Sequence, residues 1–231
     1  MLWFLMSCVI GYEEDNNHRA LTFEQSYAAH YYKFGKPLDS SLKIVSMDSD
    51  GTEMGHGSGN YFKIGKYRFI ITAAHVIGDE LTLLGVDKND LTPMKVVHID
   101  HENDIAILVP MVPMKMKPIN YVVNDSLNIL GLSVVYAGYP SDLSKSVFHG
   151  SVSSQTSQDF LMQSFALPGS SGSVVFDNKG RVVGVLSAVK LGFYEFSVMP
   201  QLHPGLVQVK RLRSYSRRRI EEIIVQWQNS N

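Results

Sequence analysis

Ser171 lies in a loop whose residue types suit a nucleophile. The stretch LPGSSGS occupies positions 167–173, and an apolar run follows at 174–176. A serine that attacks a carbonyl needs an exposed hydroxyl, and it needs backbone N–H groups aimed at the point where an oxyanion develops. Glycines on both sides of Ser171 permit the sharp backbone that aims several N–H groups one way. A Gly-Ser cluster between strands is also an ordinary turn, so the interpretation depends on partners elsewhere.

Two polar residues upstream supply such partners. His75 ends the apolar stretch FIITAAH at 69–75, and Asp104 precedes the apolar stretch IAIL at 105–108. A serine hydroxyl needs a base of near-neutral pKa, and that base needs a carboxylate to fix its tautomer and orientation. The pattern therefore predicts Ser171 as nucleophile, His75 as general base and Asp104 as the orienting carboxylate. The alternative for His75, taken alone, is a core histidine.

These motifs, in this chain order, resemble those of the chymotrypsin-like serine proteases. The resemblance is carried by TAAH at 72–75, DIA at 104–106 and GSSG at 169–172. It is closer to the high-temperature-requirement branch, through GHGSGNYF at 55–62, AGYP at 137–140 and GSVS at 150–153. Ser173, in place of a second glycine, resembles the glutamyl endopeptidases instead. The resemblance covers roughly residues 40–210.

The resemblance implies a fold and a reaction. It implies an all-β protein of two antiparallel Greek-key β-barrels, which hydrolyses peptide bonds in protein or peptide substrates through a covalent acyl-enzyme. The N–H groups of Gly169 and Ser171 are expected to form the oxyanion hole. Neither a metal nor an organic cofactor is implied. The eight histidines form no zinc-binding pattern either.

The resemblance also implies which residues contact substrate. The strand around Ser187 corresponds to the one that pairs with an extended substrate backbone. An ungapped count lines the primary specificity pocket with Phe165 and Ala166 on one side, and with Ala188 and Val189 on the other. None of these is charged, and burying an unpaired substrate charge there would cost several kcal/mol. We therefore expect small or medium-sized apolar residues on the acyl side of the cut bond.

The order of the elements agrees with this fold. From about residue 41, short apolar runs alternate with turn residues at close spacing, which predicts closed β-barrels. We expect an N-terminal extension over 1–40, a first barrel with His75 and Asp104 over 41–118, a second barrel with Ser171 over 119–210, and a C-terminal helix over 211–231. A capping-box pattern also predicts a short helix over about 23–33.

Composition limits the class of protein. The chain has 231 residues, 45% of them hydrophobic, and a net charge of −1. These values indicate a globular protein without bulk attraction to nucleic acid. The single cysteine, Cys8, excludes an intrachain disulfide. The apolar start at 1–10 lacks the basic region of a secretory signal. A cytoplasmic or virion-associated location is therefore favoured, and the apolar start is expected to be a strand or a segment that docks on a protein assembly.

The C-terminal region is basic and then amphipathic. Apolar residues recur at helical spacing at 220, 223, 224 and 227, which favours a helix packed on the first barrel. The alternative is an arm that binds nucleic acid or a partner through Lys210, Arg211, Arg213, Arg217, Arg218 and Arg219. For the whole chain, the alternative to an enzyme is a two-barrel structural or docking component of an assembly such as a virion.

Overall fold

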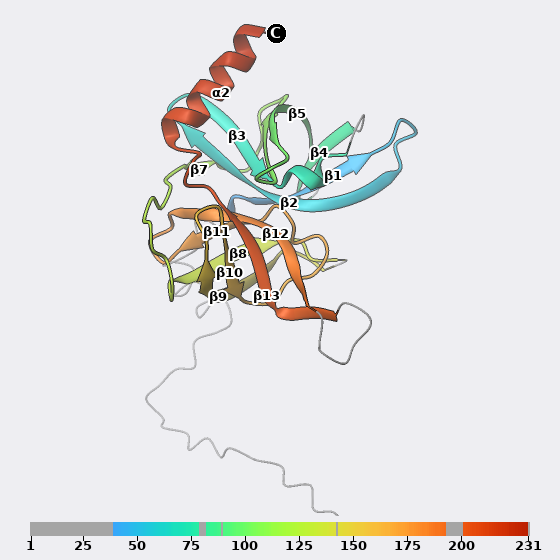
Figure 1. The fold of residues 1–231 in the computed structure, drawn as a ribbon. Helices are drawn as coiled ribbons and strands as arrows, with labels where there is room; N and C mark the ends of the chain where they lie inside the picture. Colours follow the sequence, from blue (N-terminus) through green and yellow to red (C-terminus); the bar gives the residue numbers. More distant parts are fainter. Residues whose placement is uncertain (1–38, 79–81, 89, 142, 193–200, 231) are drawn as a thin grey trace, which may run out of the picture.

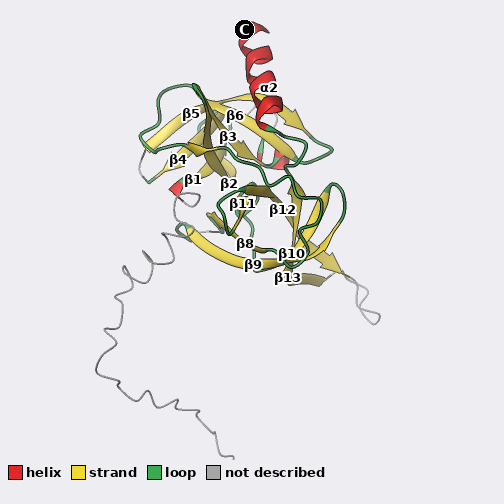
Figure 2. Cartoon of the chain, turned by 90° about the vertical axis from the view of Figure 1, so that its left-hand side faces the viewer, coloured by secondary structure: helices red, strands yellow, loops and turns green. Residues whose placement is uncertain are grey.

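The computed structural model describes residues 39–78, 82–88, 90–141, 143–192 and 201–230 (Figure 1). The helix predicted over 23–33 and the apolar start at 1–10 lie outside these ranges. Most of the described chain forms β-strands, and one long helix follows at its C-terminal end. Figure 2 shows two β-barrels stacked one on the other, with this helix on the outer side of the first barrel.

The first barrel closes around six strands. They are β1 (Ser41–Met47), β2 (Glu53–Ile64), β3 (Tyr67–Thr72), β4 (Thr82–Asp87), β5 (Asp90–Asp100) and β6 (Ile105–Pro110). Neighbouring strands follow the order β1-β4-β5-β6-β3-β2, and the antiparallel pairing of β1 with β2 closes the ring. A short strand, β7 (Ile119–Asn120), adds to β2 in parallel.

The second barrel repeats the same connectivity. Its strands are β8 (Ser133–Gly138), β9 (Ser146–Gln155), β10 (Asp159–Gln163), β11 (Val174–Asp177), β12 (Val182–Gly192) and β13 (Gln201–Arg211). In both barrels the first strand pairs with the fourth and the third with the sixth. Such returns to a non-consecutive neighbour are the Greek-key pattern. The predicted fold of two antiparallel Greek-key barrels is therefore confirmed.

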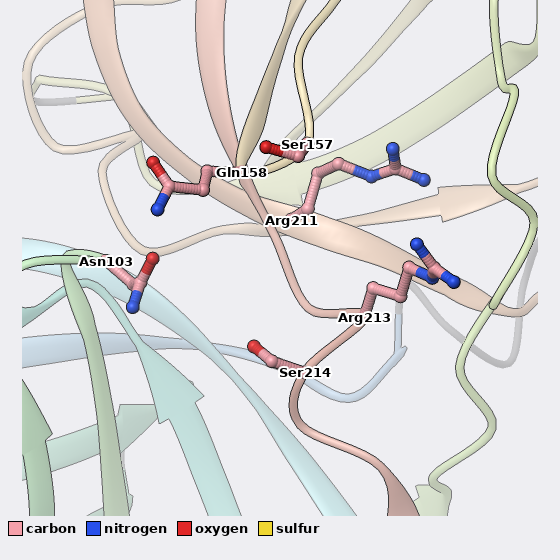
Figure 3. A pocket seen from close by; sticks show the side chains of 6 residues that line it. All are labelled: Asn103, Ser157, Gln158, Arg211, Arg213 and Ser214. Carbon is pink, nitrogen blue, oxygen red and sulfur yellow. The ribbon is translucent and has the colours of Figure 1, made fainter.

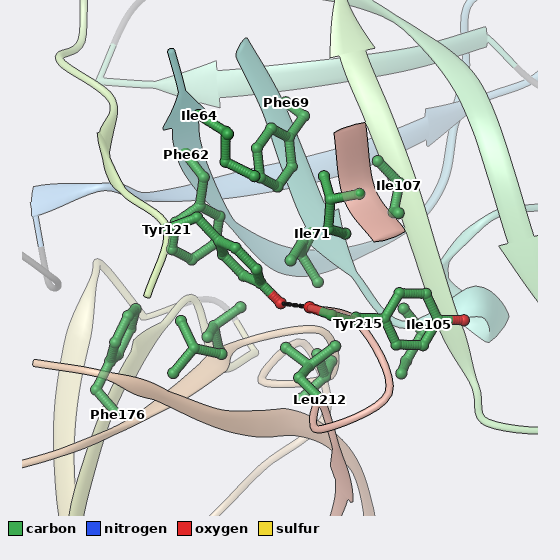
Figure 4. Close-up of a cluster of buried hydrophobic side chains, with 14 of the residues drawn as sticks. Phe62, Ile64, Phe69, Ile71, Ile105, Ile107, Tyr121, Phe176, Leu212 and Tyr215 are labelled. Atoms are coloured by element: carbon green, nitrogen blue, oxygen red, sulfur yellow. Dashed lines mark hydrogen bonds between the residues drawn. The ribbon is translucent and has the colours of Figure 1, made fainter. Parts of the chain in front are cut away.

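A single apolar cluster joins the two barrels. Phe62 and Phe69 of the first barrel and Phe176 of the second are fully buried within it (Figure 4). The Phe62 ring meets Tyr121 edge-on at 5.3 Å between ring centroids, and Phe176 at 6.2 Å. Edge-to-face aromatic pairs add about 0.5–1.5 kcal/mol to the gain from burial. Because this cluster is continuous across the seam, each barrel is held in place by the other.

The C-terminal helix covers one side of this cluster. Helix α2 (Arg217–Ser230) buries Ile220, Ile223 and Ile224, as its periodicity predicted, and it packs against β5 of the first barrel. Trp227 continues the apolar face and, with Tyr67 and other residues, lines a hollow between the helix and the barrel. The expected helix on the first barrel is therefore confirmed. No helix in the described ranges is long and apolar enough to cross a membrane.

Tyr215, just before this helix, is tied to the first barrel through its hydroxyl. The hydroxyl donates to Asp100 Oδ2 at 2.7 Å, and Asn103 donates to the same carboxylate through its backbone N–H and its side chain. Burial alone would raise the pKa of Asp100, but these hydrogen bonds outweigh it and lower the pKa to about 2. The ionised carboxylate is therefore a stabilising part of the turn that leads to Asp104.

We predict that Tyr215→Phe destabilises the fold in a pH-dependent way. The pKa of Asp100 in the folded state lies below its ordinary value of 3.8. Its contribution is therefore fully present above about pH 4 and is lost as pH falls toward 2. Losing a hydrogen bond to a charged group should lower the free energy of unfolding by about 1–3 kcal/mol at neutral pH, and by less in acid. Urea unfolding at several pH values measures this.

Tyr67→Phe is the control, because the Tyr67 hydroxyl has no hydrogen bond to the rest of the described chain. A Tyr215→Phe deficit that stays constant from neutral pH to pH 2 would contradict the prediction.

Candidate active site

Two neighbouring strands bring His75 and Asp104 together. His75 lies in a short 3₁₀ turn, Ala74–Val76, directly after β3, and Asp104 directly precedes β6. Strands β3 and β6 pair through Thr72 and Ala106, so the two polar residues meet at one edge of the barrel. Asp104 has a φ of 51°, a left-handed conformation that aspartate tolerates better than most residues.

The His75 ring is hydrogen-bonded to the Asp104 carboxylate. Nδ1 lies 2.8 Å from Oδ2 and 3.0 Å from Oδ1, and the His75 backbone N–H donates to Oδ1 at 3.0 Å. A carboxylate accepts, so Nδ1 carries the proton and Nε2 presents its lone pair. The His75 side chain is 48% exposed, whereas that of Asp104 is 15% exposed. This arrangement gives an accessible base that is oriented from behind by a shielded carboxylate.

Ser187 is a second partner of this carboxylate. Its hydroxyl, on β12, donates to Asp104 Oδ2. Burial alone would raise the pKa of Asp104, but the hydrogen bonds from His75 and Ser187 outweigh it and hold the pKa below its ordinary value. The sequence indicated Ser187 only as part of a substrate-binding strand. A lone serine in a strand carries no signal for a contact with a residue so distant in the chain.

The loop that contains Ser171 is shaped by two glycines and lies against the segment that leads to His75. Gly169 and Gly172 have φ values of 87° and 86°. A Cβ added at Gly172 would lie 2.2 Å from Thr72 Oγ1 and 3.0 Å from Ala73 N, so only glycine fits there. Ser171 is partly buried, and its carbonyl accepts from the Ser58 N–H at 2.7 Å. The loop of the second barrel therefore packs on the first barrel, against the segment that leads to His75.

The other residues expected to bind substrate have varied environments. Ala166 is buried, while Phe165 is 48% exposed and its ring lies 6.2 Å from that of Phe148. Ala188 is exposed on β12. The side chain of Val189 lies outside the part of the chain that the structure describes. Phe165, Ala166 and Ala188 are apolar by residue type, and Phe148 lies beside Phe165 as a further aromatic side chain.

Part of the basic C-terminal run is engaged within the protein. Arg211 is buried, and its guanidinium donates to the backbone carbonyls of Ser126, Leu127 and Thr156. Figure 3 shows Arg211 beside Arg213 at a cavity of about 470 Å³. Arg218 and Arg219 each approach Glu222 on the helix.

Among the residues that the structure describes, no three His, Cys, Asp or Glu side chains lie close enough together to hold a metal ion.

Comparison with known proteins identifies the family. A family model described as a trypsin-like peptidase domain matches residues 57–185, more than half of the chain. The chain belongs to the trypsin-like peptidase family. The family indicated by the motifs is thereby confirmed.

Curated relatives point to the same branch that the motifs indicated. A "Serine protease HtrA-like" of Staphylococcus epidermidis is 32% identical over 170 residues, covering 64% of this chain and 28% of that protein. One from Staphylococcus aureus is 29% identical over 170 residues, covering 65% and 22%. The chain thus spans less than a third of the length of these HtrA-like relatives. The serine endoprotease from Yersinia pestis shares the fold, with a TM-score of 0.65 at 17% identity, over 84% of this chain and 66% of that one.

We predict that Ser187→Ala raises the pKa of Asp104. The hydroxyl of Ser187 stabilises the ionised carboxylate, so its removal favours the protonated form. The measurement is a pH titration of the Asp104 carboxyl carbon by ¹³C NMR. Ser214→Ala, at an exposed serine, is the control. An Asp104 titration that is the same in Ser187→Ala and in the wild type would refute the assignment.

Proposed function

We propose that this chain is a serine endopeptidase with Ser171 as nucleophile, His75 as general base and Asp104 as the orienting carboxylate. The observation that carries the proposal is the hydrogen bond between His75 Nδ1 and the Asp104 carboxylate, with Nε2 left to accept a proton. Membership of the trypsin-like family and the contact of the Ser171 loop with the segment that leads to His75 support it.

The chemistry then proceeds in two halves. Ser171 Oγ attacks the peptide carbonyl while His75 Nε2 takes the hydroxyl proton, and Asp104 stabilises the resulting imidazolium. The N–H groups of Gly169 and Ser171 stabilise the oxyanion, and loss of one such donor typically slows kcat by about 10²–10³-fold. Collapse expels the amine, which takes the proton from His75, and leaves an acyl-enzyme. Water, activated by the same base, releases the acid and restores Ser171.

The ionisation of Asp104 fits this role. Its hydrogen bonds keep the pKa below the ordinary value, so the carboxylate remains charged when the imidazole is neutral. A charged, shielded carboxylate stabilises the imidazolium more strongly than a solvated one would, because water screens it less. We infer that the shielded Asp104 carboxylate favours proton transfer to His75 from the buried side of the ring. Substrate approaches from the side on which the ring is exposed.

We predict that a fluorophosphonate labels Ser171. Only an activated serine reacts readily with this reagent, since the reagent requires a nucleophile beside a base. Ser171→Ala should lose labelling, and Ser171→Ala or His75→Ala should lower kcat by at least about 10⁴-fold without unfolding. Mass mapping of the adduct and peptide hydrolysis measure this, with Ser214→Ala as the control.

Labelling at another serine, or full activity in Ser171→Ala, would overturn the assignment. A folded wild-type chain that neither reacts nor cleaves would instead favour the docking role.

The substrate preference gives a second prediction. Profiling with a mixed peptide library should show small or medium-sized apolar residues on the acyl side of the cut bond, because Phe165, Ala166, Ala188 and Val189 offer no partner to a charge. Val189→Gly should admit larger residues, since it removes a branched side chain from the expected mouth of the pocket. A dominant preference for Arg, Lys or Glu would show that the pocket is lined by other residues.

A further inference from the structure

Ser58 contacts the nucleophile loop on both sides of Ser170. It lies within β2 of the first barrel and is fully buried. Its backbone N–H donates to the Ser171 carbonyl at 2.7 Å, and its hydroxyl donates to the Gly169 carbonyl at 2.7 Å. The Thr72 hydroxyl in turn donates to the Ser58 carbonyl at 2.7 Å. Ser58 thus connects the strand that leads to His75 with the loop that carries Ser171.

The Ser58 hydroxyl also accepts a hydrogen bond from the second barrel. The Tyr139 N–H donates to Ser58 Oγ at 2.9 Å, which directs the hydroxyl proton toward Gly169. Nearby, the Ser141 N–H donates to the Pro168 carbonyl at 2.6 Å. The carbonyls on both sides of the Gly169 α-carbon therefore have fixed partners.

These partners determine where the Gly169 N–H points. A peptide group is planar, so holding the Pro168 carbonyl fixes the Gly169 N–H at the opposite end of the same plane. Holding the Gly169 carbonyl fixes the next plane, and together they define the conformation at Gly169. Glycine has little conformational preference of its own, so a rotated peptide would cost little without these bonds. The orientation of this N–H therefore depends on outside contacts.

The space around Gly169 agrees with a fixed conformation. A Cβ added there would lie 2.5 Å from the Tyr139 carbonyl oxygen and 2.6 Å from His56 Nε2. The position thus admits only glycine, the residue least able to hold its own orientation. The hydrogen-bond donors to the Pro168 and Gly169 carbonyls must therefore fix the orientation of this backbone segment.

We propose that Ser58 is a positioning residue for the oxyanion hole: its buried hydroxyl holds the Gly169 carbonyl and, together with the Ser141 N–H on the Pro168 carbonyl, keeps the Gly169 N–H aimed at the reacting carbonyl. This inference rests on the proposed function of the Ser171 site. Ser58 contacts no reacting atom, and its effect reaches the transition state through Gly169. Its removal therefore affects the chemical step more than substrate binding.

Ser173 offers a matched control. Its hydroxyl is also fully buried, and both it and the Ser58 hydroxyl lie against the α-carbon of Gly138. Ser173 Oγ has no hydrogen-bond partner among the described residues. Ser173→Ala and Ser58→Ala thus delete the same atom at the same interface, but only the second breaks hydrogen bonds.

The test compares the two variants in the full chain, with a peptide amide as substrate and a peptide aldehyde as inhibitor. The aldehyde forms a tetrahedral adduct with Ser171 and places its oxygen in the hole. For Ser58→Ala, we expect kcat to fall by about 10- to 100-fold, less than the roughly 10²–10³-fold for complete loss of an oxyanion donor because the Gly169 N–H is misplaced rather than removed, with KM changed by less than about threefold. Affinity for the aldehyde should fall in parallel. Ser173→Ala should match the wild type in all three.

A second variant covers failure of Ser58→Ala to fold. Ser58→Cys fills the site with a much weaker hydrogen-bond donor, so it should also lower kcat while its melting temperature stays near that of the wild type. A folded Ser58→Ala or Ser58→Cys with wild-type kcat would overturn the proposal. Equal losses of kcat in the Ser58 and Ser173 variants would also overturn it, because packing alone would then explain the effect.

One measurement is independent of activity. The Gly169 carbonyl carbon should move upfield in the ¹³C spectrum of Ser58→Ala, and not of Ser173→Ala, because only the first loses the hydrogen bond to that carbonyl. An unmoved resonance overturns the positioning role of Ser58 even if the wild type is inactive. Absence of fluorophosphonate labelling in the wild type overturns the proposed function instead, so the two failures are distinguishable.

Discussion

The seam between the two barrels is the constraint on which the rest of the structure depends. The proposed base and its carboxylate belong to the first barrel, and the proposed nucleophile belongs to the second. A hydrogen-bonded relay between them tolerates displacements of only a few tenths of an ångström. The apolar cluster around Phe62 and Phe176 holds the barrels together, whereas directional hydrogen bonds from Ser58 to the loop that carries Ser171 fix their relative position. Apolar packing is strong but non-directional, so both kinds of contact are needed.

The sequence was informative where the immediate neighbours of a residue form a distinctive motif. His75, Asp104 and Ser171 each lie in a short, distinctive context, and the periodicity of Ile220 and Ile224 was sufficient to predict the helix. The sequence did not reveal the hydrogen bonds that Ser58 and Ser187 make, because their partners lie 111 and 83 positions away in the chain. A small hydroxyl on a strand leaves no pattern in the sequence, and only the folded chain reveals which distant group it holds.

The two barrels have the same connectivity without a matching repeat in the sequence. They share one order of strand pairing, although no internal repeat is apparent in their residues. Closing six antiparallel strands into a ring by short connections leaves few acceptable routes, so similar connectivity needs only similar patterning of apolar residues and turns. His75, Asp104 and Ser171 lie at strand ends or in a loop, where substitutions do not disturb closure. This explains why a topology shared by the two barrels coexists with a distinctive loop at Gly169.

The distribution of the site across the seam has a consequence during synthesis. A ribosome releases the first barrel, with His75 and Asp104, before residue 171 has been added to the chain. The second barrel then closes only when β13 pairs with β10 and β12, and Leu212 and Tyr215 complete the shared core. A nascent chain consequently keeps His75 and Ser171 apart until β13 and the residues up to Tyr215 have emerged. The architecture itself thus makes assembly of the proposed site depend on closure of the second barrel.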